Sequence, residues 1–303
     1  MWLSVFVLAI GSGAQAKNQT GSVTLAGQAR SYTLFVPDSY SSERPVPLVV
    51  LLHGRFGTGA DMAALTDFND LAEKHRFITL YPDGLNGEWN YVKDIPGYPT
   101  DAPDDTAFLR ALIRRVSDRY AIDANRIYVA GFSNGGFMAQ RLACDAPEVF
   151  AAFASVAAAG FGGMDMVCPE TGSARLLFIH GTFDTNIPWN GYSRQVGNQA
   201  VPILFSVADT LGFWSFYNGC GSEISSRELP KSSKTAKTNV RAFTFTKCPQ
   251  GAALVLYAIE QGGHNWPGKP GRIPLGIAET VSTEIDASEV IWNYFSRYRQ
   301  GVP

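Results

Sequence analysis

The sequence has few of the cysteine and histidine residues that hold metal ions in metal-stabilised domains. Its 303 residues include only four cysteines and four histidines, and no Cys-x-x-Cys or His-x-x-x-His spacing occurs among them. Structural zinc is held by closely spaced ligands of these two types. A structural zinc site is therefore not expected, and no metal ion is predicted.

A strong charge of one sign is also missing. The net charge is −2 at pH 7 and no basic stripe runs along the chain, which argues against a nucleic-acid partner. Lys231, Lys234 and Lys237 lie among serines and threonines. We interpret them as part of a solvated loop rather than a phosphate site. Hydrophobic residues make up 46% of the chain and charged residues 17%, so a sizeable core is predicted.

The N-terminal segment lacks charge and is short. Residues 2–10 are apolar, and this run is too short to span a bilayer, so no membrane anchor is predicted. Ala14-Gln15-Ala16 fits the small-x-small rule for signal-peptide cleavage, although the basic n-region is missing. We expect a signal peptide over residues 1–16 and an exported, extracellular or periplasmic domain over residues 17–303. The alternative is a buried first strand.

The cysteines agree with export because their number is even. Three connectivities are possible. We favour Cys144 with Cys168 and Cys220 with Cys248, because each pair brackets a loop-rich segment. Asn18-Gln19-Thr20 is a glycosylation sequon, which has meaning only in a eukaryotic secretory host.

Strand-like and helix-like patterns alternate along the whole chain, without an internal repeat or a flexible linker. The predicted strands are a hairpin at 22–25 and 30–36 and single strands at 48–53, 77–81, around 127, 150–158, 176–180 and 254–259. The predicted helices cover 61–75, 104–119, the residues after 133, 203–217 and 285–298, whereas 85–103 and 219–250 are predicted loops. This order predicts one α/β domain with a doubly wound, mostly parallel sheet of about eight strands.

Gly131-Phe132-Ser133-Asn134-Gly135 is a Gly-x-Ser-x-Gly motif between a predicted strand and a predicted helix. A nucleophilic serine on this turn has a strained backbone and an exposed hydroxyl, and the flanking glycines leave the turn its space. The pentapeptide alone occurs often by chance. Its strand–turn–helix setting predicts that Ser133 is the nucleophile of an α/β-hydrolase fold.

A serine nucleophile needs a base, which a carboxylate orients. Among the histidines, His75 falls late in a predicted helix, whereas His53 and His180 precede glycines at strand ends and are expected to shape turns. His264 lies in a loop after the last strand, where this fold places its base. We therefore predict His264 as the base, with His180 as the fallback.

The orienting carboxylate should follow the strand that ends at His180. Asp184 has that position, and the order Ser133, Asp184, His264 matches the order of nucleophile, acid and base in this fold. The alternative for Asp184 is an Asx-turn residue. Asp209 is a weaker competitor because it falls within a helical pattern.

The oxyanion of an acyl-transfer reaction needs two preorganised donors. We predict the backbone N–H of Asn134, in the first turn of its helix, and the backbone N–H of Arg55, after His53-Gly54. Phe56 follows closely and is a predicted substrate contact. Trp89 and Trp266 lie in loops beside the catalytic positions; each is either a wall of the site or core.

With these residues assembled, the sequence resembles the polyhydroxybutyrate-depolymerase-like esterases, which are related to feruloyl and acetylxylan esterases. The resemblance covers most of the mature chain. It rests on Leu52-His53-Gly54, Tyr81-Pro82-Asp83-Gly84 with Trp89-Asn90, Asp104-Asp105 before Phe108-Leu109, Gly131–Gly136, His180-Gly181-Thr182 with Asp184, Asn218-Gly219-Cys220, and Gly262–Gly268.

The resemblance implies a secreted α/β-hydrolase that cleaves carboxylic esters through an acyl-enzyme. It also implies the disulfides Cys144–Cys168 and Cys220–Cys248. Arg55-Phe56 departs from the smaller residues that usually follow His-Gly, which predicts a bulkier or differently charged acyl pocket. The motifs leave open a polyester, a feruloylated sugar or an acetylated xylan as the substrate, and they leave the oligomeric state undetermined.

We therefore expect a serine esterase whose mechanism requires neither a metal ion nor an organic cofactor. Two alternatives are a serine peptidase of the same fold and a catalytically inactive binding protein. Such peptidases usually carry a further large domain, and none fits within this chain. A binding protein would be expected to have lost a member of the triad, yet all three positions are filled.

Overall fold

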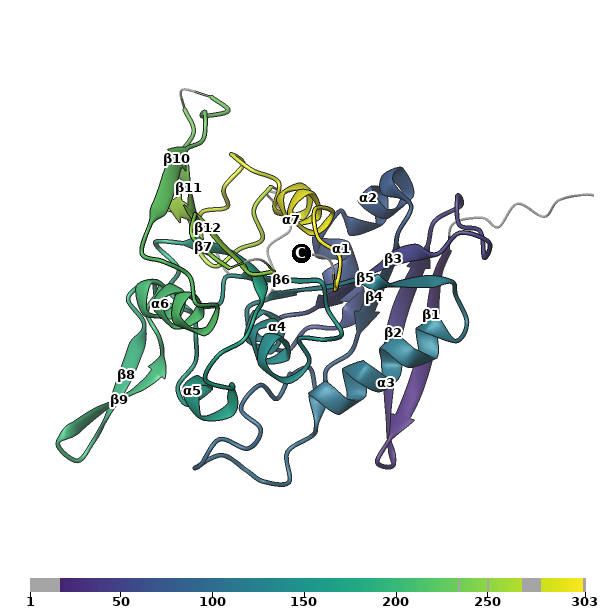
Figure 1. The fold of residues 1–303 in the computed structure, drawn as a ribbon, viewed down its shortest axis with the longest axis horizontal. Coiled ribbons are helices and arrows are strands. Elements are labelled where there is room, and N and C mark those ends of the chain that lie inside the picture. Colours follow the sequence, from purple (N-terminus) through teal and green to yellow (C-terminus); the bar gives the residue numbers. More distant parts are fainter. Residues whose placement is uncertain (1–16, 234, 250, 269–278, 302–303) are drawn as a thin grey trace, which may run out of the picture.

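Ten strands form one sheet in the computed structural model, in the order β1-β2-β4-β3-β5-β6-β7-β12-β11-β10. The structure describes residues 17–233, 235–249, 251–268 and 279–301, so the predicted signal peptide lies outside the described residues. The strands are β1 (Lys17–Leu25), β2 (Gln28–Val36), β3 (Val46–Leu52), β4 (Ile78–Pro82), β5 (Ile122–Phe132), β6 (Ala152–Val156), β7 (Arg175–Gly181), β10 (Ile224–Glu228), β11 (Asn239–Phe245) and β12 (Ala253–Glu260). Figure 1 shows the sheet running through the molecule.

The six central strands, from β4 to β12, are parallel to one another. Antiparallel strands extend the sheet on both sides, β2 and β1 beyond β4, and β11 and β10 beyond β12. The doubly wound, mostly parallel sheet is as predicted. Because parallel strands end at the same side, the loops after β5, β7 and β12 meet at one carboxyl edge of the sheet.

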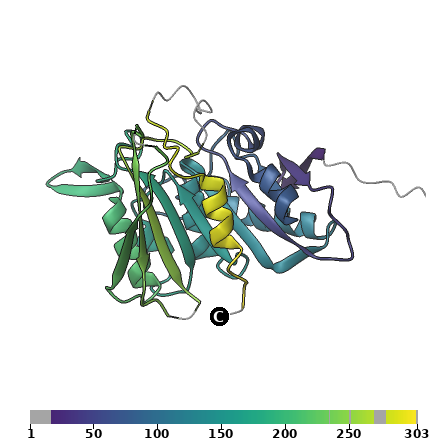
Figure 2. The same cartoon turned by 90° about the horizontal axis from the view of Figure 1, so that it is seen from above.

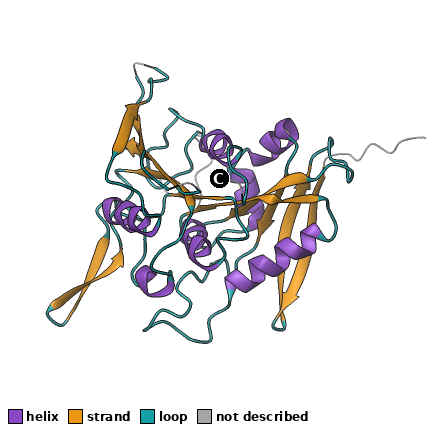
Figure 3. Ribbon diagram, in the orientation of Figure 1, coloured by secondary structure: helices purple, strands orange, loops and turns teal. Residues whose placement is uncertain are grey.

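Helices cover both faces of the sheet (Figure 3). One face carries α1 (Gly59–Leu65), α2 (Phe68–His75) and α7 (Ala287–Phe295), and Figure 2 shows α7 crossing this face. The other face carries α3 (Asp105–Ser117), α4 (Asn134–Asp145), α5 (Met164–Val167) and α6 (Val207–Tyr217). In the part of the chain that the structure describes, none of the helices has the length and apolar content needed to cross a membrane.

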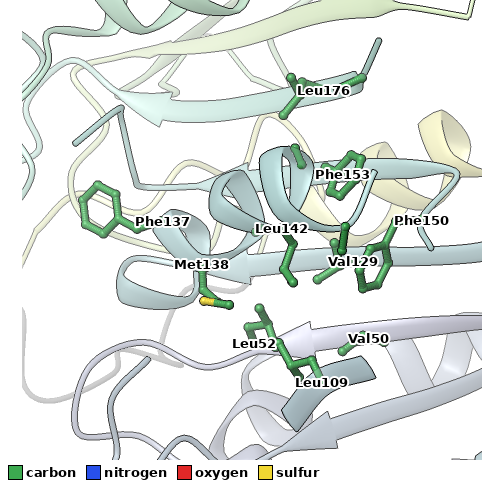
Figure 4. Packing of buried hydrophobic residues seen from close by; sticks show 14 of the residues in the cluster. Val50, Leu52, Leu109, Val129, Phe137, Met138, Leu142, Phe150, Phe153 and Leu176 are labelled. Atoms are coloured by element: carbon green, nitrogen blue, oxygen red, sulfur yellow. The ribbon is translucent and has the colours of Figure 1, made fainter. Parts of the chain in front are cut away.

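The continuous apolar runs of the central strands fill both layers of core. Within β3, Leu48, Val50 and Leu52 pack on the face of α3 and α4, whereas Val49 and Leu51 pack on the opposite face. Successive side chains of a strand point to opposite faces, so a strand covered on both sides must be apolar throughout. Figure 4 shows the α4 side of this core, where Met138 and Leu142 lie over the strands.

The prediction of a loop over residues 219–250 was wrong, because this segment contains β10 and β11. All five residues of β10 are exposed, and β11 is buried at only one position. β10 is polar apart from Ile224, and in β11 the apolar alternation is short, with Phe243 and Phe245 packed against the core. Both strands form because the outer edge of β12 offers unpaired backbone groups, and they raise the sheet from about eight strands to ten.

Two predicted helices also differ from the helices in the structure. The helix expected at 203–217 begins only at Val207, after Ser206, whose hydroxyl accepts the Asp209 N–H. The preceding residues form β9 (Gln199–Leu204), paired with β8 (Tyr192–Val196) in a hairpin that projects from the body (Figure 1). The helix expected at 61–75 is broken at Thr66, whose extended backbone separates α1 from α2.

Both disulfides pair cysteines that are neighbours in the sequence. Cys144, in α4, is joined to Cys168, which follows α5. Cys220 follows α6 and is joined to Cys248, just after β11. The first bond ties α4, the helix that follows Ser133, to the short helix α5, and the second anchors the outer strands to the body.

Candidate active site

Ser133 lies on a strained turn between β5 and α4. Its backbone angles are φ 53° and ψ −117°, and it precedes the first residue of the helix. A side chain at Gly131 would collide with the backbone of Gly135, and one at Gly135 would collide with the backbone at Leu52 and His53. The two glycines are therefore required by the turn. A positive φ at a residue other than glycine costs about 1–3 kcal/mol and persists where the surroundings enforce it.

Asp184 and His264 lie together at the carboxyl edge. Nδ1 of His264 is 2.8 Å from Oδ2 of Asp184, and both side chains are buried. The other oxygen of Asp184 accepts the backbone N–H groups of Asn186 (3.0 Å) and Ile187 (2.7 Å). Asp184 thus forms an Asx turn and also contacts the imidazole. A carboxylate accepts only, so Nδ1 carries the proton and Nε2 remains a potential base.

Ser133 and His264 are brought to the same place by their neighbours. The ring of Phe132 packs against the ring of His264, with 5.0 Å between their centroids. Among the described residues no hydrogen bond joins the Ser133 hydroxyl to the imidazole. In serine hydrolases without substrate this bond is often long and tightens only in the substrate complex.

Two backbone N–H groups are available for an oxyanion site. In the part of the chain that is described, the N–H groups of Asn134 and Arg55 donate to no other group. The N–H of Phe56 is used, because it donates to the carbonyl of Gly87 at 2.7 Å. A side-chain carbon at Gly54 would lie 3.4 Å from Cβ of Ser133, so the Arg55 loop passes directly beside the serine.

His53 sets the direction of the Arg55 N–H. Its Nδ1 is 2.7 Å from the carbonyl of Gly54, and its Nε2 accepts the N–H of Gly84 at 2.8 Å. The carbonyl of Gly54 and the N–H of Arg55 belong to one planar trans peptide and point in opposite directions. Holding the carbonyl inward therefore turns the N–H outward. Burial lowers the pKa of His53, which favours the neutral imidazole that these two bonds require.

Trp89 links the two donor segments from within the protein. Its backbone N–H donates to Oδ1 of Asn134 at 2.7 Å, and the Asn134 amide donates back to its carbonyl at 3.2 Å. Its indole N–H donates to the carbonyl of His53 at 3.0 Å. Only 2% of Trp89 is exposed, so its contacts are those of a scaffold under the site. Substrate contact by Trp89 stays a prediction.

The other predicted substrate contacts differ in exposure. Trp266 is 2% exposed and donates its indole N–H to Ser288 at 3.1 Å, whereas Phe56 is 65% exposed beside the Arg55 loop. Phe183, next to Asp184, is 67% exposed and was not identified from the sequence. The signal in the sequence was an aromatic residue directly before the predicted orienting carboxylate.

His180, the fallback base, is buried beside Asp184. Its Nε2 lies 2.9 Å from the carbonyl of Ile187 and 3.7 Å from Oδ2 of Asp184. Burial lowers the pKa of His180. These contacts support the turn that carries Asp184, as expected for a histidine that shapes a turn.

A buried ion pair that the sequence analysis missed supports the Trp89 loop. Arg30 contacts Asp105, whose second oxygen accepts the N–H of Asn90 at 2.6 Å. The guanidinium lies 3.7 Å from the centroid of Phe108. Arg30 shares the buried face of β2 with Leu34 and Val36. A charged residue at an inward position signals a buried partner, but the sequence does not say which.

Comparisons with known proteins show similarity to esterases. Residues 30–170 match the family model described as "Esterase PHB depolymerase". Feruloyl esterase D of Neurospora crassa is 29% identical over 306 residues, covering 95% of this chain and 89% of that protein. The NocK protein of Nocardia uniformis subsp. tsuyamanensis, which bears an esterase name, is 28% identical over 279 residues, covering 89% of this chain and 80% of that protein.

Among solved structures, an acetyl xylan esterase from Aspergillus awamori superposes with a TM-score of 0.60 at 15% identity. The match covers 92% of this chain and 99% of that one. At this level of identity the likeness concerns the fold, which is the α/β-hydrolase fold.

Proposed function

We propose that this chain acts through an acyl-enzyme on Ser133. The chain belongs to the family of polyhydroxybutyrate-depolymerase-like and feruloyl esterases and is a carboxylic ester hydrolase. The proposal rests on one observation above all. Asp184 and His264 are in contact at 2.8 Å, and this contact lies at the same carboxyl edge of the sheet as the strained turn of Ser133.

In the proposed acylation, Oγ of Ser133 attacks the ester carbonyl while Nε2 of His264 takes its proton. Asp184 holds the imidazole and stabilises the imidazolium. The N–H groups of Asn134 and Arg55 bind the oxyanion, each worth roughly 3 kcal/mol of the barrier. The carbon–oxygen bond to the alcohol then breaks, and the imidazolium protonates the departing alkoxide.

Deacylation repeats these steps with water. His264 removes a proton from the water, which attacks the acyl carbonyl, and the same donors hold the second oxyanion. The acid leaves and Ser133 regains its proton. Every proton is carried by His264, so the cycle needs no metal ion or organic cofactor.

For the substrate, we propose small or polymer-derived esters of the feruloyl, acetyl or hydroxyalkanoate type. The relatives named feruloyl esterase support the first of these. The exposed rings of Phe56 and Phe183 flank the loops of Arg55 and Asp184, where the acyl group would lie. We also propose that the protein is exported, in keeping with its two disulfides.

The test is hydrolysis by the purified protein and by its Ser133→Ala variant. The substrates are p-nitrophenyl acetate and butyrate, methyl ferulate and a soluble hydroxybutyrate oligomer. We expect the wild type to cleave at least one of them and the variant to lose the activity, and the preferred substrate identifies the acyl class. Equal activity of the two proteins would contradict the proposed mechanism.

A further inference from the structure

A second carboxylate lies beside the Asp184–His264 pair. Glu279 is half-buried, and its Oε2 accepts the backbone N–H of His264. Its Oε1 accepts both the hydroxyl and the backbone N–H of Thr185, the latter at 3.2 Å. One carboxylate group therefore bridges His264 itself and the residue that follows Asp184.

This bridge lies farther along the two loops than two other hydrogen bonds that join them. The loops after β7 and β12 are also joined by the Phe183 N–H to the carbonyl of Gly262 (2.9 Å) and by the Gln261 N–H to the Thr182 hydroxyl (3.0 Å). Both of these bonds precede Asp184 and His264 in the chain. Among the described residues, the Glu279 carboxylate is a second link between the loops at the catalytic positions, beside the direct contact of Asp184 with His264.

The surroundings are shaped to hold this side chain. A side chain at Gly263 would collide with the carboxylate of Glu279, so glycine leaves the room it occupies. The N–H of Gly263 donates to the carbonyl of Thr280 at 3.0 Å, and the Asn265 amide donates to the carbonyl of Glu279 at 3.3 Å. The Glu279 segment is thus docked along the loop that carries His264.

The chemistry of the site calls for a carboxylate. Three donors converge on Glu279, namely two N–H groups and one hydroxyl. An ionised carboxylate has two oxygens and only accepts, whereas the amide of a glutamine would turn an NH₂ group toward a donor. Hydrogen bonds to a charged acceptor are also about twice as strong as neutral ones.

We propose that Glu279 is a positioning residue for the catalytic pair, holding Asp184 and His264 in register by clamping Thr185 to the His264 backbone. This inference rests on the proposed function. Glu279 touches no reacting atom in this scheme. Its loss therefore lowers kcat through misplacement of the imidazole and leaves KM nearly unchanged. A misplacement of about 1 Å can cost about a hundredfold in rate.

The chain contains a matched control. Glu284 binds Ser232 in the same way, accepting its N–H at 2.6 Å and its hydroxyl at 2.7 Å. Ser232 lies in the loop between β10 and β11, the strands farthest from β5 on that side of the sheet, and among the described residues neither Ser232 nor Glu284 hydrogen-bonds to Asp184 or His264. Glu279→Ala and Glu284→Ala therefore remove equivalent clamps, and only the first lies at the proposed site.

The experiment measures kcat, KM and the melting temperature of the full chain with p-nitrophenyl acetate. It compares the wild type with Glu279→Ala, Glu279→Gln, Glu284→Ala, Thr185→Val and the double variant Thr185→Val/Glu279→Ala. We expect kcat to fall about ten- to hundredfold in Glu279→Ala and less in Glu279→Gln, with KM changed less than about threefold. Glu284→Ala should keep the wild-type kcat. As a single substitution, Thr185→Val should lower kcat. In the Glu279→Ala background the same substitution should cause little further loss of kcat.

An unchanged kcat in Glu279→Ala would overturn the inference, as would an equal loss in Glu284→Ala or a loss that appears only in the melting temperature. Fully additive effects of the Thr185 and Glu279 substitutions would also overturn it. The parallel Ser133→Ala measurement separates the two claims. If that variant is inactive while Glu279→Ala is normal, the esterase mechanism stands and the clamp falls; if Ser133→Ala keeps the wild-type activity, the mechanism itself has failed.

Discussion

Trp89 donates its indole N–H to the backbone carbonyl of His53 at 3.0 Å, and the two rings pack with 5.0 Å between their centroids. His53 holds the peptide that bears the Arg55 N–H, and the backbone of Trp89 holds the side chain of Asn134. The two proposed oxyanion donors come from loops after different strands. Trp89 is the residue that fixes one relative to the other.

Replacing Trp89 with phenylalanine should therefore lower both stability and kcat. The change leaves the buried carbonyl of His53 without its donor, which costs about 1–3 kcal/mol of unfolding free energy. We expect kcat to fall about tenfold, less than the hundredfold or more that outright removal of an oxyanion donor costs.

Trp214→Phe is the control for that variant. Trp214 is fully buried and donates its indole N–H to the Gln140 side chain at 3.2 Å, within the core beside α4. Urea unfolding should show a similar loss of stability in both variants, with a lowered kcat in Trp89→Phe alone. Equal kcat values for the two would contradict the role given to Trp89.

The buried ion pair of Arg30 and Asp105 should be costly to break on one side only. Asp105→Asn leaves the Arg30 guanidinium buried without a counter-charge, and such changes typically cost about 3–5 kcal/mol. The comparison is Glu148→Gln, which breaks the more exposed pair with Arg110 and should cost about 1 kcal/mol or less. Urea denaturation of both variants measures the difference in the free energy of unfolding. Similar small decreases in both variants would contradict the larger stabilising role of the buried pair.

Stability should fall in mild acid because buried histidines stay neutral. Burial lowers the pKa of both His53 and His180 below the ordinary 6.5. Below pH 6.5 the unfolded chain then binds more protons than the native one, so stability is full above 6.5 and declines as the pH falls toward the folded-state pKa. Each histidine contributes at most about 1.4 kcal/mol per pH unit.

Urea unfolding from about pH 8 to about pH 5 measures this slope. His180→Gln should flatten it, since the protonation difference of one buried group is removed. His75→Gln is the comparison: burial lowers the pKa of His75 too, but His75 is exposed at the end of α2 and water screens its surroundings, so this variant should flatten the slope less. The same slope in wild type and His180→Gln would contradict the assignment of a neutral, buried His180.

The sequence predicted the parts of this protein that local pattern and strand order determine. Continuous apolar runs identified the central strands, and parallel topology then brought the loops of Ser133, Asp184 and His264 to one edge. The outer strands β10 and β11 were missed because β10 is almost wholly polar and the apolar alternation in β11 is short. Pairings between distant polar residues were also missed. Arg30 is 75 residues from Asp105, and Thr185 is 94 residues from Glu279, so no local spacing relates them.

The disulfide Cys220–Cys248 should support stability without supporting activity. It ties the outer strands to the body, away from the carboxyl edge, and closes a loop with a sequence separation of 28. Loops of this size typically contribute about 3–4 kcal/mol. Replacing both cysteines with serine should therefore lower the unfolding free energy by about that amount and leave kcat unchanged. A lost kcat in a folded variant would contradict this separation of roles.

The acyl-enzyme is the central claim, and mass spectrometry tests it most directly. The wild type and Ser133→Ala are mixed with p-nitrophenyl acetate, quenched in acid within the first turnovers and digested for peptide mapping. The account predicts one acetyl group on the peptide that contains Ser133 in the wild type, together with a burst of p-nitrophenol, and neither signal in the variant. Steady hydrolysis by the wild type with no acetylated Ser133, and the same rate in Ser133→Ala, would contradict it.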